Sequence, residues 1–166
     1  MSHPCIQQPT NMNKEKSRCS LHKVGVESAS VLLNMMQEFY AIDNYSFERE
    51  QAIAALNEFI KHPDLGCSWL IQKDNTFIGY AILCVGFTFE FGGRDAFIDE
   101  LFIEKPYRNK GYGRQVMDLI EEYAKSLNLV ALHLEVEEHN TNGLALYRRM
   151  GFKGKQSRLL SKSLRH

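Results

Sequence analysis

The spacing of apolar residues changes twice along this chain, and these changes limit the folds it can adopt. Between residues 28 and 62 apolar side chains recur at helical spacing, as on two helices that each bury one face. Between residues 68 and 103 the period is two, and Asp74–Asn75 and Gly92–Gly93 supply hairpin turns. Helical spacing then returns at Val116. Two helices followed by an antiparallel meander exclude both an all-helical and an all-β domain.

The rest of the chain predicts strand, helix, strand, helix and further strands. The helix after residue 113 carries a buried stripe of Val116, Leu119, Ile120, Tyr123 and Leu127. A short helix is capped by Asn140 or Asn142 and ends at Gly151. Expected strands are 21–26, 68–73, 76–91, 96–103, 130–136, 152–155 and 158–164. We therefore expect a single-domain α/β fold, a mixed and mostly antiparallel sheet of about seven strands flanked by four helices. Residues 1–20 are expected to be a flexible tail and residues 21–166 the domain.

Composition argues against several classes of partner. Twenty Lys and Arg balance 20 Asp and Glu, so the formal net charge is +0, whereas nucleic-acid binders usually carry a basic stripe. The longest mostly apolar run, Thr76–Phe89, is shorter than the roughly 18–20 residues that span a bilayer. The polar N-terminus has no apolar core of a secretory signal, and the four cysteines form no CxxC pair. We expect a cytoplasmic protein without a metal site, a nucleic-acid partner or a membrane partner.

Residues 108–113 carry the most informative local pattern. Gly111 and Gly113 let the backbone fold tightly, so that several N–H groups point at one spot just before a helix begins. The helix N-terminus and three cations, Arg108, Lys110 and Arg114, add positive charge, a combination that suits a pyrophosphate. The alternative is an ordinary turn that uses glycines for geometry alone. A P-loop is excluded because Gly-Lys-Ser/Thr is missing, and a dinucleotide fingerprint because Val116 occupies the third small position.

A second motif makes a family resemblance specific. Arg-x-x-Gly-x-Gly at 108–113 is followed by Asn-x-x-Gly-x-x-Leu-Tyr-x-x-x-Gly-Phe at 140–152. Together they resemble the GCN5-related N-acetyltransferase family, as does the strand 97–103 that precedes the first motif. The resemblance covers roughly residues 21–164. It implies a sheet splayed between the fourth and fifth strands, with acetyl-CoA as cosubstrate in the gap between strands 96–103 and 130–136.

The resemblance also implies roles for individual residues. Backbone groups of Leu101 and Ile103 would pair with the pantetheine arm, and backbone N–H groups of the same strand would bind the thioester oxygen. Tyr147 matches the tyrosine that protonates the departing thiolate; the alternative is a core tyrosine. The residues implied in cofactor binding are Leu101, Phe102, Ile103, Arg108, Asn109, Lys110, Gly111, Tyr112, Gly113, Arg114 and Asn140. Asn140 has a second reading as a helix cap, which is compatible with the first.

Two adjacent carboxylates are the acid–base candidates. An alkylamine with a pKa near 10.4 is almost fully protonated at neutral pH, so direct transfer needs a group that removes a proton. Neighbouring strand residues point to opposite faces, so only one of Asp99 and Glu100 is expected to reach the cleft. Asp99 is preferred, because it matches the acid of the diamine acetyltransferases that this strand resembles. The alternative is that both are ion-pair or sheet-face residues.

The resulting hypothesis is an acetyl-CoA-dependent N-acetyltransferase that acts on a primary amine of a small molecule or peptide. The rival is a non-catalytic CoA-binding sensor or interaction module, and a homodimer is compatible with either. Between the first two helices, Tyr40, Asp43 and Tyr45 either border the acceptor side or anchor a solvated loop. An acidic cluster predicts a mouth that attracts a cationic amine; its members are Asp43, Glu90, Asp95, Asp99 and Glu100.

Overall fold

The computed structural model describes residues 18–154 and 160–164, and these residues form one five-stranded sheet with four α-helices. The strands lie in chain order and are β1 (Cys19–Lys23), β2 (Gly66–Lys73), β3 (Thr76–Thr88), β4 (Gly93–Ile103) and β5 (Leu132–Leu134). The first four pair antiparallel, and β5 pairs parallel to β4. The mixed, mostly antiparallel α/β fold expected from the sequence is confirmed.

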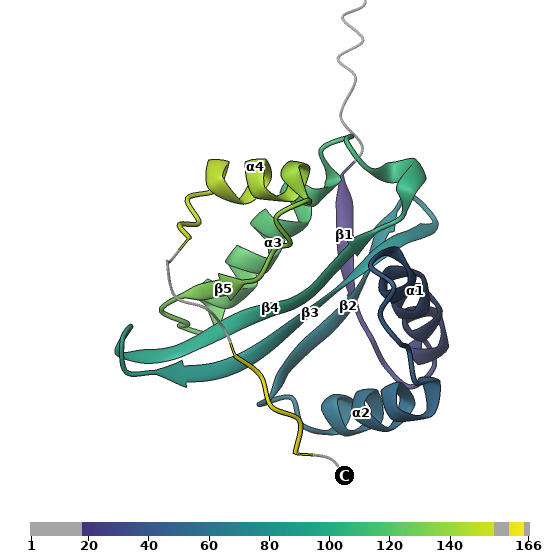
Figure 1. Ribbon diagram of the computed structural model, residues 1–166, viewed down its shortest axis with the longest axis horizontal. Coiled ribbons are helices and arrows are strands. Elements are labelled where there is room, and N and C mark those ends of the chain that lie inside the picture. The colour runs from purple at the N-terminus through teal and green to yellow at the C-terminus, as the bar shows by residue number, and fades with distance from the viewer. Residues whose placement is uncertain (1–17, 155–159, 165–166) are drawn as a thin grey trace, which may run out of the picture.

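The helices cover both faces of the sheet and divide the core in two (Figure 1). They are α1 (Ala29–Ile42), α2 (Arg49–Lys61), α3 (Tyr112–Ser126) and α4 (Thr141–Arg149), with a 3₁₀ turn at Lys105–Tyr107. On one face, Val116 and Ile120 of α3 are fully buried against the sheet. On the other face, Leu32 of α1 is fully buried, whereas Leu56 is the one buried residue of α2. The helix α2 therefore lies over the sheet with little close packing.

Helix boundaries follow the local signals in the sequence. Ser28 occupies the N-cap of α1, but its hydroxyl accepts from the Gly25 N–H rather than from the N–H groups of the helix. The helix α2 ends before His62–Pro63, since the residue before a proline avoids the helical region. Gly151 follows α4 in the left-handed conformation that ends many helices.

A β-bulge interrupts the long pair β3–β4. Ile82 lies opposite Glu100 and Leu83 lies opposite Ile98, so that Asp99 has no partner on β3. A regular strand would place Ile98 and Glu100 on one face. The extra residue instead sends Ile98 into the core under α3 and turns Glu100 toward α1 and α2. This bulge decides which side chains of β4 face α1 and α2 and which face α3.

The C-terminal part differs from the expectation of about seven strands. The strand expected at 130–136 is limited to β5, and its pairing with β4 ends at Ile98 and Leu134. Residues 152–154 and 160–164 form no strand, and residues 155–159 lie outside the described residues. Leu160 and Leu164 are 89% and 83% exposed, so these apolar side chains do not form a buried strand face. Apolar alternation alone does not make a strand, because the backbone also needs a neighbour that accepts its hydrogen bonds.

The first strand also begins slightly earlier in the chain than the sequence predicts. The strand expected at 21–26 begins at Cys19, two residues before the expected start of the domain. The tail expected for residues 1–20 falls largely on residues 1–17, which lie outside the described residues. Among the helices that the structure describes, none combines the length and the apolar character needed to cross a bilayer.

Candidate active site

Beyond Ile98, the backbone of β4 has no hydrogen-bonded strand among the described residues on the side where β5 lies. Pairing with β5 involves only Ala96–Ile98, so Leu101 and Ile103 lie beyond the last paired residues. The Ile103 carbonyl accepts a hydrogen bond from Arg108 Nε at 2.7 Å, and that side chain thereby links the strand to the following loop. Phe102 points the other way and is buried in the core under α1. Where the two parallel strands separate, the open edge fits the sequence-based expectation for an extended ligand arm.

The backbone of the loop 108–113 has a conformation that suits the binding of an anion. Asn109 and Gly111 have positive φ angles of 60° and 88°, and α3 begins directly afterwards at Tyr112. The first N–H groups of a helix have no acceptors within the helix, so those of the first turn of α3 remain available. An added Cβ at Gly111 would meet no atom within 4 Å. The glycine is therefore required by its φ angle, and the space beside it is open.

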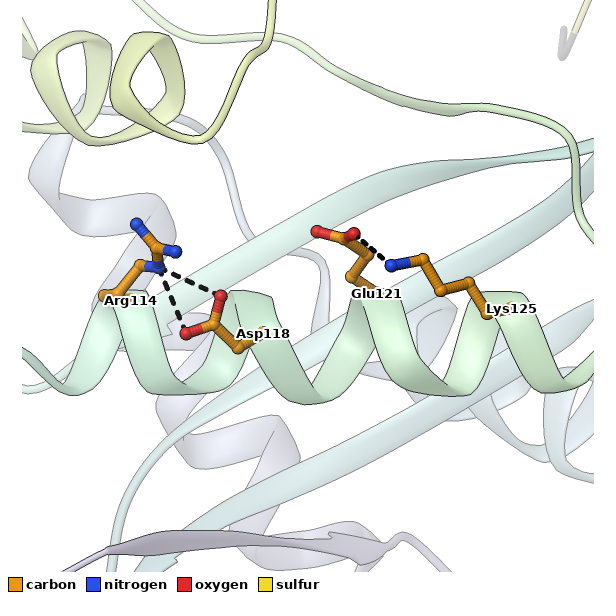
Figure 2. A network of polar contacts seen from close by, with 4 residues as sticks. All are labelled: Arg114, Asp118, Glu121 and Lys125. Carbon is orange, nitrogen blue, oxygen red and sulfur yellow. Dashed lines mark hydrogen bonds and ion pairs between the residues drawn. The ribbon is translucent and has the colours of Figure 1, made fainter.

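The three cations of this loop region have different surroundings. The Arg108 guanidinium lies 5.5 Å from the centre of the Phe102 ring, and Lys110 Nζ lies 5.8 Å from that of Tyr107. Arg114 Nε contacts both carboxylate oxygens of Asp118, at 2.9 and 3.0 Å. Figure 2 shows this pair and the Glu121–Lys125 pair along the same side of α3. Lys110 thus carries no carboxylate partner among the described residues, whereas the charge of Arg114 is partly balanced by Asp118.

The start of α4 contacts the same loop. Asn140 caps α4 by accepting the Gly143 N–H at 2.9 Å, which confirms the capping role expected for it. A Cβ at Gly143 would lie 2.8 Å from the Asn140 amide, so a larger residue at that position would displace the capping side chain. Asn142 Nδ2 donates to Asn109 Oδ1 at 3.4 Å. These contacts fix the N-terminus of α4 next to the loop 108–113.

Tyr147 lies on α4 and packs against the core under α3. It is half-buried, and its ring contacts that of Phe152 edge to face at 6.0 Å. Its hydroxyl makes no hydrogen bond with a residue that the structure describes, and burial raises its pKa above the usual value of 10. The hydroxyl therefore stays protonated at neutral pH and is available to donate.

A cavity of about 300 Å³ lies between α1, α2 and the sheet, on the α2 side of β4. Its lining is partly apolar and includes three carboxylates, of Glu48, Asp99 and Glu100, with no basic side chain among the described residues that form it. The complete lining is Met36, Tyr40, Ser46, Phe47, Glu48, Gln51, Ala52, Ala55, Leu56, Phe59, Ile82, Cys84, Asp99 and Glu100. The loose packing of α2 against the sheet leaves this space.

Both acid–base candidates line the cavity, contrary to the expectation that only one could reach it. The reason is the bulge, since Asp99 is the extra residue and does not obey strict alternation. Glu100 is 8% exposed and accepts hydrogen bonds from the Tyr40 and Tyr80 hydroxyls at 2.9 and 2.6 Å. Burial raises the pKa of Glu100, and the two hydrogen bonds oppose that shift. Burial also raises the pKa of Asp99.

The acidic cluster expected around the mouth is assembled differently. Asp95 is 4% exposed and contacts His133 Nε2 at 3.0 Å, and Asp43 contacts His139 Nε2 at 3.1 Å. Neither carboxylate lines the cavity, and Glu90 does not line it either. Glu48, which the sequence reading overlooked, does line it. Its position at the start of α2 could have indicated this role, because α2 covers the cavity.

Comparison with known proteins agrees with this arrangement. The model of the acetyltransferase (GNAT) family matches residues 32–152. An uncharacterized N-acetyltransferase YycN of Bacillus subtilis (strain 168) is 36% identical over 59 residues, 36% of this chain and 38% of the relative. A probable spermine N(1)-acetyltransferase of Bacillus subtilis subsp. natto (strain BEST195) is 34% identical over 56 residues, 33% of this chain and 37% of the relative. The matched segments thus span less than half of these curated relatives.

Solved structures share the fold over most of the chain. An integron cassette protein from the mobile metagenome of Cole Harbour Salt Marsh has a TM-score of 0.77 at 29% identity, covering 88% of this chain and 91% of its own. A predicted acetyltransferase of Clostridium acetobutylicum, solved with acetyl-CoA, has a TM-score of 0.74 at 17% identity, covering 89% and 98%. The open edge of β4, the loop 108–113 and the family match over 32–152 lead to one conclusion. The chain belongs to the acetyltransferase (GNAT) family.

Proposed function

We propose that this protein transfers the acetyl group of acetyl-CoA to a primary amine by direct attack. The observation that carries the proposal is the order of features along β4. Asp99 and Glu100 line the cavity, and the residues that follow them, Leu101–Ile103, lie where β4 and β5 separate. An amine bound in the cavity would therefore meet a thioester lying along the open edge. The loop 108–113 follows after the 3₁₀ turn Lys105–Tyr107 and suits the pyrophosphate.

The chemistry assigns Tyr147 as the general acid. The amine nitrogen bonds to the thioester carbon, and backbone N–H groups of β4 stabilise the oxygen that becomes negative. When the carbon–sulfur bond breaks, Tyr147 donates its proton to the thiolate, whose usual pKa is near 8.5. A carboxylate of β4, Asp99 or Glu100, removes a proton from the ammonium before attack.

The charge of the cavity supports a cationic acceptor. Three carboxylates and no basic side chain face the space among the residues described as lining it, and the rings of Tyr40, Phe47 and Phe59 suit an ammonium group. One relative is named for spermine, a polycation. A small-molecule amine fits a cavity of about 300 Å³, which is at the lower end for ligand sites.

The test of this function is release of free CoA thiol from acetyl-CoA in the presence of a broad panel of amines. We expect amine-dependent release, with mass spectrometry showing one acetyl group on the amine. Saturable acetyl-CoA binding without thiol release for any amine would instead support the non-catalytic CoA-binding module.

Salt dependence tests the cationic acceptor separately. For an alkylamine cation we expect kcat/KM to fall several-fold between low and high salt, because mobile ions screen the attraction of the three carboxylates. For an aromatic amine that is uncharged at neutral pH we expect little change. Equal salt sensitivity of the two amines, or a preference for the uncharged one, would contradict an acidic acceptor cavity.

A further inference from the structure

The carboxyl group of Glu100 is held from two sides by tyrosines that belong to different elements. Tyr40, near the end of α1, donates to Oε1 at 2.9 Å, and Tyr80, on β3, donates to Oε2 at 2.6 Å. Each oxygen thus has its own phenolic donor, and Glu100 as a whole is 8% exposed. The two hydroxyl donors fix the orientation of this carboxylate and stabilise its ionised form against burial, which raises its pKa.

The two donors are themselves held by aromatic packing. Tyr80 is fully buried, and Phe39 and Phe102 lie within 6.2 and 5.8 Å of its ring. Tyr40 contacts the rings of Tyr45 and Phe47 at 6.4 and 5.4 Å and lines the cavity. Tyr80 is therefore the rigid donor inside the core, and Tyr40 is the donor that a bound ligand can reach.

Asp99 has the opposite surroundings in the same cavity. The bulge leaves it without a partner on β3, and it is more exposed than Glu100. Its carboxyl makes no hydrogen bond or ion pair with any of the described side chains, and burial alone is the cause of its raised pKa. The two adjacent carboxylates thus differ in their donors: Glu100 already accepts one hydrogen bond on each oxygen and keeps further acceptor sites, whereas Asp99 can take up a proton without breaking a hydrogen bond.

We propose that the two carboxylates divide the work: Glu100, held by Tyr40 and Tyr80, is the stationary anion that binds the acceptor ammonium, and Asp99 takes the proton. Tyr40 and Tyr80 are then positioning residues that act through Glu100. This inference rests on the proposed acetyl transfer. It reverses the usual reading of a buried glutamate as the base, because both oxygens of Glu100 already accept strong hydrogen bonds.

The proton balance follows from these roles. The ammonium of the acceptor loses one proton to the Asp99 carboxylate, and the neutral amine then forms the nitrogen–carbon bond with the thioester. The nitrogen loses its second proton as the carbon–sulfur bond breaks, and Tyr147 supplies the proton that leaves on CoA-SH. The second nitrogen proton restores Tyr147, and Asp99 returns the first to solvent. Amide, CoA thiol and one released proton are the products.

The groups that face Glu100 determine the sign of its pH dependence. Burial raises the pKa of Glu100, the hydrogen bonds from Tyr80 and Tyr40 lower it, and the charge of Asp99 raises it. Cys84 on β3, whose pKa burial raises to about 11, and Glu48 at the start of α2 complete the titratable groups of the cavity. Removing the Tyr40 donor therefore raises the pKa of Glu100. On acidification, the carboxylate of the variant then becomes protonated at a higher pH than that of the wild type.

The experiment compares the variant Tyr40→Phe with the control variant Tyr45→Phe. Each variant removes a tyrosine hydroxyl that donates to a glutamate. Tyr45 donates to Glu137 at 3.1 Å and does not line the cavity. The ratio of kcat/KM between variant and wild type is measured for one alkylamine across the acid range. The ionisation of the amine is the same with either enzyme, so this ratio isolates the protein group. We expect the ratio to fall toward low pH for Tyr40→Phe and to stay flat for Tyr45→Phe.

A pair of isosteric variants tests the division of work directly. Glu100→Gln is expected to raise the KM of the amine about tenfold or more, with a smaller change in kcat, because the ammonium loses its charged partner. Asp99→Asn is expected to lower kcat by about 10²–10⁴-fold with a small change in KM. The KM for acetyl-CoA should stay near wild type in each and serves as the check on folding.

Two results would overturn the inference. One is the reverse split, in which Glu100→Gln loses kcat and Asp99→Asn raises the amine KM. The other is a pH-independent ratio for Tyr40→Phe, or one that matches Tyr45→Phe. A wild-type protein that binds acetyl-CoA and acetylates no amine is a different outcome, since it refutes the proposed function itself.

Discussion

Replacing Tyr147 by phenylalanine is expected to lower kcat by about 10²–10⁴-fold while acetyl-CoA affinity stays near wild type. The substitution removes only a hydroxyl, and that hydroxyl makes no hydrogen bond with a described residue. The ring contact with Phe152 and the packing against α3 remain, so folding should be unaffected. The expected loss is therefore the loss of proton donation to the thiolate. It is measured as amine-dependent thiol release at saturating acetyl-CoA.

Tyr123→Phe provides the matched control for this experiment. Tyr123 is also half-buried on a helix, but it packs edge to face on Trp69 at 4.9 Å, away from the cavity. We expect the control to keep its kcat. A Tyr147→Phe variant with full kcat, under conditions where chemistry limits the rate, would assign Tyr147 to packing alone.

Replacing Gly111 by valine is expected to abolish the thermal stabilisation that acetyl-CoA confers. The φ angle of 88° at Gly111 is strained for any residue with a Cβ and most of all for a β-branched one. The backbone N–H groups of the loop would then no longer converge on the pyrophosphate. At a ligand concentration near 100 times Kd, wild-type stabilisation is about 2.7 kcal/mol, or roughly 5–10 °C in Tm.

The control for backbone strain is Gly92→Val in the β3–β4 hairpin. Gly92 has a φ angle of 72°, and as at Gly111 a Cβ would meet no atom within 4 Å. Both variants should lose intrinsic Tm to a similar extent, but only Gly92→Val should retain the shift on adding acetyl-CoA. Undiminished stabilisation of Gly111→Val would place the pyrophosphate elsewhere.

Local features of the chain were predictable because they depend on neighbouring residues. The helical stripe of α3, the cap of α4 by Asn140 and the turn at Gly111 each follow from residues a few positions apart. The family match over residues 32–152 agrees with the resemblance of two motifs in the right order. The proposed cofactor side of the site consists of such local elements, and for that reason its residues could be proposed from sequence.

The proposed acceptor side depends on contacts between distant segments, which the sequence alone does not indicate. Tyr40 and Tyr80 are 60 and 20 residues from Glu100, and nothing in their spacing indicates that they share its carboxyl group. Strict alternation gave the wrong answer at Asp99, because a bulge depends on how two strands fit each other. The pairing of Asp95 with His133 and of Asp43 with His139 likewise joins segments that only the fold brings together.

By itself the sequence determined the order of helices and strands, the loop that precedes α3 and the membership of a family, because each is written in short-range patterns. The tertiary structure decided the extent of the sheet and the acidic lining of the cavity. It also decided the different surroundings of two adjacent carboxylates, Asp99 and Glu100. The physical reason is that hydrogen bonds, burial and charge at that site come from α1, α2, β3 and β4 together. Their combined effect exists only once those elements are packed.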